Sequence, residues 1–287
     1  RCVPSAQHSL AFELFGLAAE VTSDDKELFD RFPSILPPGW CVPSGTRPSV
    51  RFGLMRDGTV TLDGAEVSRT DGDLARALVV LGLTVRHHLA EHAPGYVFVH
   101  AGVVSVDGVG IVIPGSSFSG KTMLVAELVR AGATYYSDEY AVIDAMGMVH
   151  AYAKPLSIRL DASDRNDVPV PDAQSGATPI QAALVVVTEY EQGASWRPVA
   201  LTRAQGALAL LEHTVAVRAK PADAMVAARL LAQNALFIAG TRGEASAAAP
   251  AILEARASLV RKPLDVVRSR RDFDEHSTRR TTRGHTD

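Results

Sequence analysis

Several features are scarce in this chain, and each scarcity excludes a class of protein. Cysteine occurs only twice, at Cys2 and Cys41, and neither has the Cys/His spacing of a metal site around it. We therefore expect no disulfide framework, and we expect a reducing, cytoplasmic setting. No apolar run approaches the length of a membrane span, and no segment has the pattern of a signal peptide.

An excess of charge of one sign is also lacking. The chain has 32 acidic and 29 basic residues, which leaves a formal net charge of −3. A protein that binds nucleic acid or an anionic membrane surface through its overall field carries a clear basic excess. We therefore expect no nucleic-acid partner and no membrane partner.

Apolar residues, in contrast, are plentiful and make up 47% of the 287 positions. This length and composition predict a packed core in one large or two modest domains. The pattern of elements predicts a β-rich region with one helix over residues 1–92 and a core of strands and helices over residues 93–260. Residues 261–287 are polar with mixed charge, and we expect this tail to be disordered.

Two local patterns define the first region. Residues 50–54 and 59–62 flank a turn at residues 56–58, which predicts a β-hairpin. Residues 71–91 place apolar side chains on one helical face after an aspartate that can cap it, which predicts a helix. The region is therefore expected to be a small sheet with one helix against it.

The predicted core has more strands than helices in its first half and mainly helices in its second. Its strands are expected over residues 97–106, 109–113, 133–136, 140–144, 148–152, 154–160 and 182–188, and its helices over residues 123–130, 203–217, 221–239 and 245–260. Residues 161–180 are polar and contain Pro and Gly, which predicts a mobile loop. This order is typical of the mixed α/β class, with a mixed sheet flanked by helices, rather than of a regular βαβ series.

A complete phosphate-binding loop follows the apolar strand at residues 109–113. In a strand–loop–helix frame, backbone amides and the helix start hold phosphates. The loop lysine then reaches the β- and γ-phosphates, and the loop threonine binds Mg²⁺. The sequence therefore predicts a site for ATP or GTP with Mg²⁺, and the alternative is a Gly/Ser turn that binds nothing. The loop residues are Gly115, Ser116, Ser117, Phe118, Ser119, Gly120, Lys121 and Thr122.

The best carboxylate candidates are Asp138 and Glu139, which follow the strand at residues 133–136. A strand that neighbours the loop strand would bring them near the γ-phosphate. One carboxylate would then hold Mg²⁺ while the other accepts the proton of an acceptor hydroxyl. The alternative is a carboxylate pair on the surface at the end of a strand.

Three basic or titratable residues complete the candidates. His100 lies in an apolar strand, where it either contacts a phosphate or the acceptor, or is a core histidine with its hydrogen bonds satisfied. Lys154 and Arg159 follow the predicted hairpin. Each either binds the acceptor or a phosphate, or is a solvated surface charge.

The segment around the loop resembles the HPr kinase/phosphorylase family. The matching features are the strand at residues 99–104 with its histidine, the turn after it, the loop with its helix, and the acidic pair before a hydrophobic strand. The resemblance implies an HPr-kinase-like P-loop core over residues 93–260, related to phosphoenolpyruvate carboxykinase. It also implies ATP- and Mg²⁺-dependent phosphorylation of a hydroxyl, usually that of a serine.

The same resemblance assigns roles to single residues. Asp138 is implied as the catalytic base, His100 and Lys121 as further catalytic residues, and Glu139 as a metal-associated residue beside Thr122. The second acid is a glutamate here where the family usually has an aspartate. That longer side chain leaves the division of roles between the two acids open.

The chain also departs from the family. Residues 153–159 stand where the family carries an Arg-rich signature after the acidic pair, and the first region does not look like the family's regulatory domain. HPr is therefore not the expected substrate. The layout is similar to divergent HPr-kinase-like proteins of peptide natural-product pathways, some of which phosphorylate a serine of a lasso-peptide precursor.

Several functions remain open at this point. The acceptor hydroxyl is expected on a peptide, a protein or a small molecule, and a homo-oligomer is compatible with the sequence. The alternatives are a non-catalytic nucleotide-binding regulator, an HPr-type or small-molecule kinase, a plain ATPase or GTPase, and a carboxykinase-like lyase. Lys121, Thr122 and both acids together favour a kinase over a regulator, because a site that has lost its chemistry has no need of them.

Overall fold

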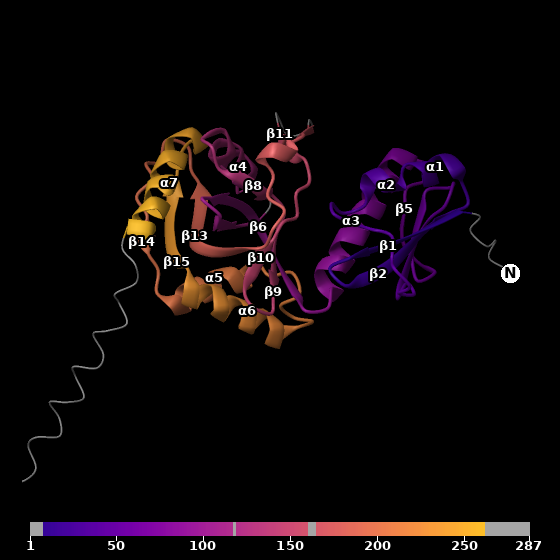
Figure 1. Ribbon diagram of the computed structural model, residues 1–287. Coiled ribbons are helices and arrows are strands. Elements are labelled where there is room, and N and C mark those ends of the chain that lie inside the picture. Colours follow the sequence, from indigo (N-terminus) through magenta and orange to yellow (C-terminus); the bar gives the residue numbers. More distant parts are fainter. Residues whose placement is uncertain (1–7, 117–118, 160–164, 262–287) are drawn as a thin grey trace, which may run out of the picture.

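The structure is a computed structural model that describes residues 8–116, 119–159 and 165–261. Its strands form a five-stranded sheet, an eight-stranded sheet and a two-stranded pair (Figure 1). The strands of the five-stranded sheet all precede residue 70, and those of the eight-stranded sheet all follow residue 95. The mixed α/β class is thus confirmed, while the division of the chain into domains at residue 92 stays a prediction.

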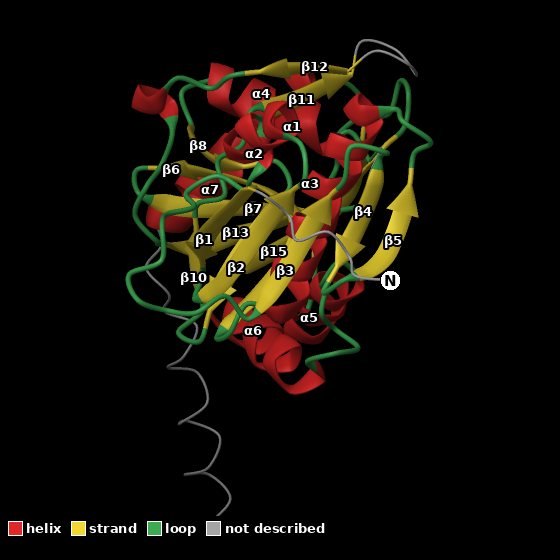
Figure 2. Cartoon of the chain, turned by 90° about the vertical axis from the view of Figure 1, so that its right-hand side faces the viewer, coloured by secondary structure: helices red, strands yellow, loops and turns green. Residues whose placement is uncertain are grey.

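The smaller sheet has the strand order β1-β2-β3-β4-β5. Figure 2 shows these five strands. Strands β2 and β3 are parallel, whereas the other neighbours are antiparallel. The predicted hairpin is confirmed as β3 and β4. The five strands are β1 (His8–Leu14), β2 (Leu17–Ser23), β3 (Val50–Leu54), β4 (Thr59–Leu62) and β5 (Ala65–Arg69).

Three helices accompany this sheet, so the prediction of one helix is wrong. The long predicted helix is α3 (Leu74–His92), which packs its apolar face on the sheet. The two short helices are α1 (Lys26–Asp30) and α2 (Phe32–Ile35). Asp25 caps α1 by accepting hydrogen bonds from the first amides of the helix, and a proline lies in the first turn of α2. Such short helices form through caps and tertiary packing, which hydrophobic periodicity does not reveal.

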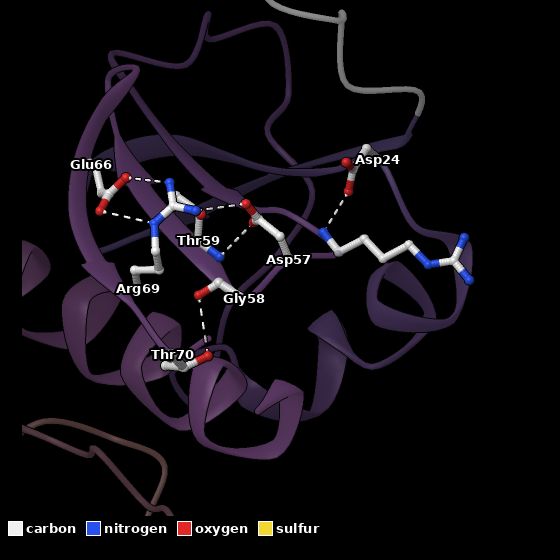
Figure 3. A network of polar contacts seen from close by, with 8 residues as sticks. Asp24, Asp57, Gly58, Thr59, Glu66, Arg69 and Thr70 are labelled. Carbon is white, nitrogen blue, oxygen red and sulfur yellow. Dashed lines mark hydrogen bonds and ion pairs between the residues drawn. The ribbon is translucent and has the colours of Figure 1, made fainter. Parts of the chain in front are cut away.

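A polar network ties the turn between β3 and β4 to the end of β5 (Figure 3). Arg69 bridges Asp57 at 2.9 Å and Glu66 at 2.8 Å. Thr70 Oγ1 donates a hydrogen bond to the carbonyl of Gly58 at 3.2 Å. These contacts fix the chain immediately before α3, and so they orient the helix that leads to the larger sheet.

The larger sheet has the strand order β10-β9-β6-β7-β13-β15-β14, with β8 paired to β6. Strand β13 is parallel to β7 and β15, and the other pairs are antiparallel. The strands are β6 (Tyr96–Val106), β7 (Val109–Pro114), β8 (Thr134–Ser137), β9 (Tyr140–Asp144), β10 (Met148–His150), β13 (Ile180–Tyr190), β14 (Val199–Ala200) and β15 (Leu236–Arg242).

Helices cover both faces of this sheet (Figure 1). Helices α4 (Lys121–Arg130) and α7 (Ala245–Arg261) lie on one face, and α5 (Arg203–Glu212) and α6 (Pro221–Asn234) lie on the other. The alternation along β7 explains why both faces are apolar. Ile111 and Ile113 belong to the core under α4 and α7, whereas Val112 belongs to the core over α5 and α6.

Two predictions for the core are corrected. The predicted helix over residues 221–239 stops at Asn234, because the next residues form β15 and pair in parallel with β13. The predicted mobile loop over residues 161–180 contains β12 (Arg165–Val168), which pairs with β11 (Leu156–Arg159), and the short helix η1 (Asp172–Gln174). In both segments, hydrogen bonding between strand backbones determines the structure, and a polar sequence can form such a strand as well as an apolar one.

Two further predictions concern the chain as a whole. Among the described helices, none combines the length and the hydropathy that crossing a bilayer requires. The predicted disorder of the tail concerns residues 262–287, which lie outside the described residues.

Candidate functional site

The predicted phosphate loop joins β7 to α4. Gly120 is the N-cap of α4 with φ at +77°, and it has no side chain with which to bond the first amides of the helix. The amides of Lys121 and Thr122 therefore begin the helix without a side-chain cap, which is the arrangement that binds anions. Two loop residues of the predicted site, Ser117 and Phe118, lie outside the described residues.

Lys121 is bound to the loop itself. Its Nζ donates hydrogen bonds to the carbonyl of Gly115 at 2.7 Å and to that of Ser116 at 2.6 Å. The residue is buried. Burial lowers the pKa of Lys121 to about 8, and the nearby Asp138 carboxylate opposes that shift. A buried ammonium thus lies beside the loop, where the phosphates of a nucleotide would need a positive charge.

The acidic pair reaches the loop by way of β6. Strand β6 pairs with β9 up to His100 and with β8 from Val103, so that Asp138 and Glu139 form the link between two strands on one edge of β6. On its other edge β6 pairs with β7, and the amide of Gly115 donates to the carbonyl of His100 at 3.1 Å. The expectation that the strand before the acidic pair neighbours the loop strand is therefore wrong, because β6 lies between β8 and β7.

Thr122 and Asp138 nevertheless meet. Thr122 Oγ1 donates a hydrogen bond to Asp138 Oδ2 at 3.3 Å, and Asp138 is buried. A hydroxyl and a carboxylate in this relation are ligands of the kind that Mg²⁺ takes next to a nucleotide. One buried oxygen atom of the loop, Ser119 Oγ, has no hydrogen-bond partner within the described part of the chain. The donor set therefore fits a magnesium ion with a phosphate group.

Two cations approach Glu139 from different parts of the chain. Lys154 Nζ lies 3.4 Å from Glu139 Oε2, and Arg86 Nε lies 3.5 Å from Glu139 Oε1. Arg86 belongs to α3, which faces the larger sheet (Figure 1). Sequence reasoning missed Arg86, because it assigned α3 to the first region. The available signal was an arginine directly after Val85 on the buried side of the helix.

Asp138 has two further neighbours. Tyr135 OH lies 3.4 Å from Asp138 Oδ1 and donates to the carbonyl of Lys154 at 2.7 Å. Burial and the Asp138 charge raise the pKa of Tyr135, so its hydroxyl keeps its proton as a neutral donor. Lys154 Nζ lies 4.0 Å from Asp138 Oδ1. The Asp138 carboxylate is therefore held in position by its contacts with a threonine, a tyrosine and a lysine.

His100 lies between the loop and the acidic pair. Burial, together with the charge of Lys121, lowers the pKa of His100 to about 4. The imidazole is therefore neutral near pH 7 and acts by hydrogen bonding rather than as a cation. Arg159, which was predicted as a substrate contact, ends β11, and its side chain lies outside the described part. Its role stays a prediction.

Arg242 supports the loop from β15, although sequence reasoning did not rank it among the site residues. Its Nη2 donates to the carbonyl of Gly120 at 2.9 Å, and its Nη1 donates to the carbonyl of Gly243 at 2.9 Å. The guanidinium also lies 5.7 Å from the centre of the Tyr190 ring. Arg242 is almost fully buried, with 1% exposure. A buried guanidinium at the last residue of β15 thus holds the end of the loop in place.

A solved kinase structure has a weak likeness to this chain. The HPr(Ser) kinase/phosphatase from Coxiella burnetii is 14% identical, with a TM-score of 0.37 over 57% of this chain and 99% of that chain. No protein-family model matches the chain, and no curated protein matches its sequence. A likeness at this TM-score establishes neither a family nor a function, so the function of this chain depends on its own residues.

Proposed function

We propose that this protein is an ATP- and Mg²⁺-dependent kinase that phosphorylates a serine-type hydroxyl of a peptide or protein. The observation that carries the proposal is the 3.3 Å hydrogen bond from Thr122 Oγ1 to Asp138 Oδ2. It joins the metal-binding hydroxyl of a phosphate loop to a buried carboxylate from another strand. Phosphoryl transfer needs this combination of a phosphate site, a metal ligand and a carboxylate near the acceptor.

Each residue of the site has a part in holding the nucleotide. The loop from Gly115 to Thr122 provides amides and the Lys121 ammonium for the triphosphate. Thr122 and Glu139 provide oxygen ligands for Mg²⁺. The bound Mg–ATP supplies the phosphoryl group and neutralises part of its charge. Arg242 holds the carbonyl of Gly120 and so keeps the loop in position.

Asp138 acts on the acceptor. Its carboxylate, fixed by Thr122 and Tyr135, orients the acceptor hydroxyl. It accepts the hydroxyl proton as that oxygen bonds to the γ-phosphorus of ATP and the bond from this phosphorus to the oxygen of the leaving ADP breaks. The neutral His100 contributes a hydrogen bond to the acceptor or to a phosphate oxygen. Arg86 and Lys154 place positive charge beside Glu139 and balance the negative charges that gather there.

The proposal gives the acceptor only as a class of molecule. The similarity of the chain's overall layout to HPr-kinase-like proteins of peptide natural-product pathways supports a precursor peptide, including that of a lasso natural product, as the substrate. Cytoplasmic location, ATP as the nucleotide and Mg²⁺ as the metal are parts of the same proposal. The competing function is a nucleotide-binding regulator without chemistry, and the experiment below separates the two.

The test is transfer of label from γ-labelled ATP to serine-containing peptides. The wild-type protein should transfer phosphate only with Mg²⁺, and Asp138→Asn should reduce the rate at least about 100-fold, the order of general-base catalysis. Glu127→Gln is the matched control, because Glu127 lies on α4 and, among the described residues, its side chain pairs with Arg130 near the surface. A regulator would bind ATP without transfer to any peptide, and equal rates in wild type and Asp138→Asn would refute the role of Asp138.

A further inference from the structure

A cavity lies between the first region and the larger sheet, beside the acidic pair. Its volume is about 360 Å³. One wall comes from the segment of α2 and the loop after it, a second from α3, and a third from the segment before β11. The lining residues that carry charge or chemistry are Arg31, Ser34, Arg86 and Lys154, and the apolar wall includes Ile35, Leu36, Pro37, Pro38 and Val79.

The charge of this cavity is of one sign. Among the described residues that line it, Arg31, Arg86 and Lys154 are basic and none is acidic. This contrasts with the chain as a whole, in which acidic residues outnumber basic ones by 32 to 29. A concave site with an apolar wall and clustered cations fits a ligand that carries both apolar and anionic groups.

The cavity adjoins the candidate active site. Arg86 and Lys154 line it, and the same two side chains form the ion pairs with Glu139 at 3.5 Å and 3.4 Å. A chain segment in the cavity is therefore separated from the acidic pair by a single layer of side chains. This is the distance over which residues next to an acceptor serine would extend.

We propose that this cavity binds an acidic segment of the acceptor peptide, close to the hydroxyl that is phosphorylated. The proposal rests on the proposed kinase function and adds the substrate class and its subsite. Arg31, which is exposed and has no part in the catalytic site, attracts a carboxylate of the peptide. The wall formed by Ile35, Leu36 and Val79 receives a neighbouring apolar side chain. The first region is thereby the part of the chain that selects the acceptor.

The experiment measures peptide binding directly, so its result does not depend on phosphate transfer. Two fluorescent ten-residue peptides are compared on the full chain by anisotropy. One contains a serine between glutamate and leucine residues, and the other has glutamine in place of each glutamate. The acidic peptide should bind at least about ten-fold more tightly than the neutral one. Equal affinities would overturn the proposal even if the protein proves to be a kinase.

Two variants locate the binding site. Arg31→Glu should weaken the acidic peptide about ten-fold or more, whereas Arg76→Glu, the same change at an exposed position of α3 outside the cavity, should leave its affinity within about two-fold. Ala75→Trp, which fills the cavity from an exposed position, should weaken both peptides. Equal losses in Arg31→Glu and Arg76→Glu, or displacement of the acidic peptide by equimolar inorganic phosphate, would contradict a peptide subsite here.

The failure of one proposal is distinguishable from the failure of the other. If the acidic peptide binds as described but receives no label from ATP, the kinase assignment fails and the peptide subsite stands. If label is transferred to serine peptides regardless of their acidic residues or of Arg31, the subsite fails and the kinase assignment stands.

Discussion

Thr122 Oγ1 lies 3.3 Å from Asp138 Oδ2, although one residue begins α4 and the other follows β8. The two positions are brought together because β6 pairs with β7 on one edge and with β8 and β9 on the other. The hydroxyl at the end of a phosphate loop thus faces a buried carboxylate across one strand. The account of a metal-dependent phosphotransferase depends on this relationship.

ATP binding should weaken in mild alkali. The pKa of Lys121 is lowered from 10.5 to about 8, so its ammonium is charged below pH 8 and loses its proton as the pH rises above it. The affinity for ATP, measured by calorimetry with Mg²⁺ present, should therefore fall about ten-fold between pH 7 and pH 9. Lys121→Arg is the control, because a guanidinium stays charged over this range and should give a flatter profile. Identical profiles would exclude Lys121 as the titrating group.

Gly120 should be required by the loop for two separable reasons. Its φ of +77° strains any residue with a Cβ, and an added Cβ would lie 2.6 Å from Arg242 Nη2. Gly132, at the other end of α4, has φ at +101° but no atom within 4 Å of an added Cβ. Alanine at either position should lower the free energy of unfolding by about 1–2 kcal/mol, measured by urea denaturation.

Of the two variants, Gly120→Ala alone should also weaken ATP binding. Gly120, unlike Gly132, accepts a hydrogen bond from Arg242, the residue that supports the loop. Equal ATP affinities in Gly120→Ala and Gly132→Ala would show that Arg242 does not position the loop.

The close approach of α4 to β6 should depend on Gly102. A Cβ added to Gly102 would lie 2.5 Å from Val125 Cγ2. Gly102→Ala should therefore destabilise the protein by about 1–3 kcal/mol, the usual cost of overpacking. Val125→Ala in the same chain removes the clashing methyl groups, so the double variant should be more stable than the sum of the two single changes in thermal unfolding. Strict additivity would mean that the two sites do not touch.

Local sequence was sufficient for the elements that carry the site. The loop, its helix, the strand before it and the helix α3 all follow from periodicity and capping, since Asp73 accepts the hydrogen bond of the Arg76 amide as a capping residue should. The acidic pair was named as a candidate because it follows a strand soon after the phosphate loop, and the structure places Asp138 beside Thr122, while the roles of the two acids stay predictions. These features are local, and short-range patterns encode them well.

The parts that escaped prediction depend on contacts between distant segments. The buried side of α3 marks Arg86 as a charged residue in an unusual place, but only the packing of α3 against the larger sheet determines that its partner is Glu139. Arg242 reaches Gly120 only because β15 pairs with β13 in parallel, and that strand was predicted as the end of a helix. Partner strands and charge pairs of this kind are decided by tertiary packing, which local propensity does not contain.

The most direct test of the account is a double-mutant cycle at Thr122 and Glu139, read as the dissociation constant of ATP in the presence of Mg²⁺. If both residues hold the same metal ion, Thr122→Val and Glu139→Gln should each weaken binding, and the double variant should lose much less than the sum of the two losses. The coupling should exceed about 0.5 kcal/mol, and it should disappear when Mg²⁺ is removed by chelation. Additive losses, or coupling that persists without Mg²⁺, would contradict a shared metal site.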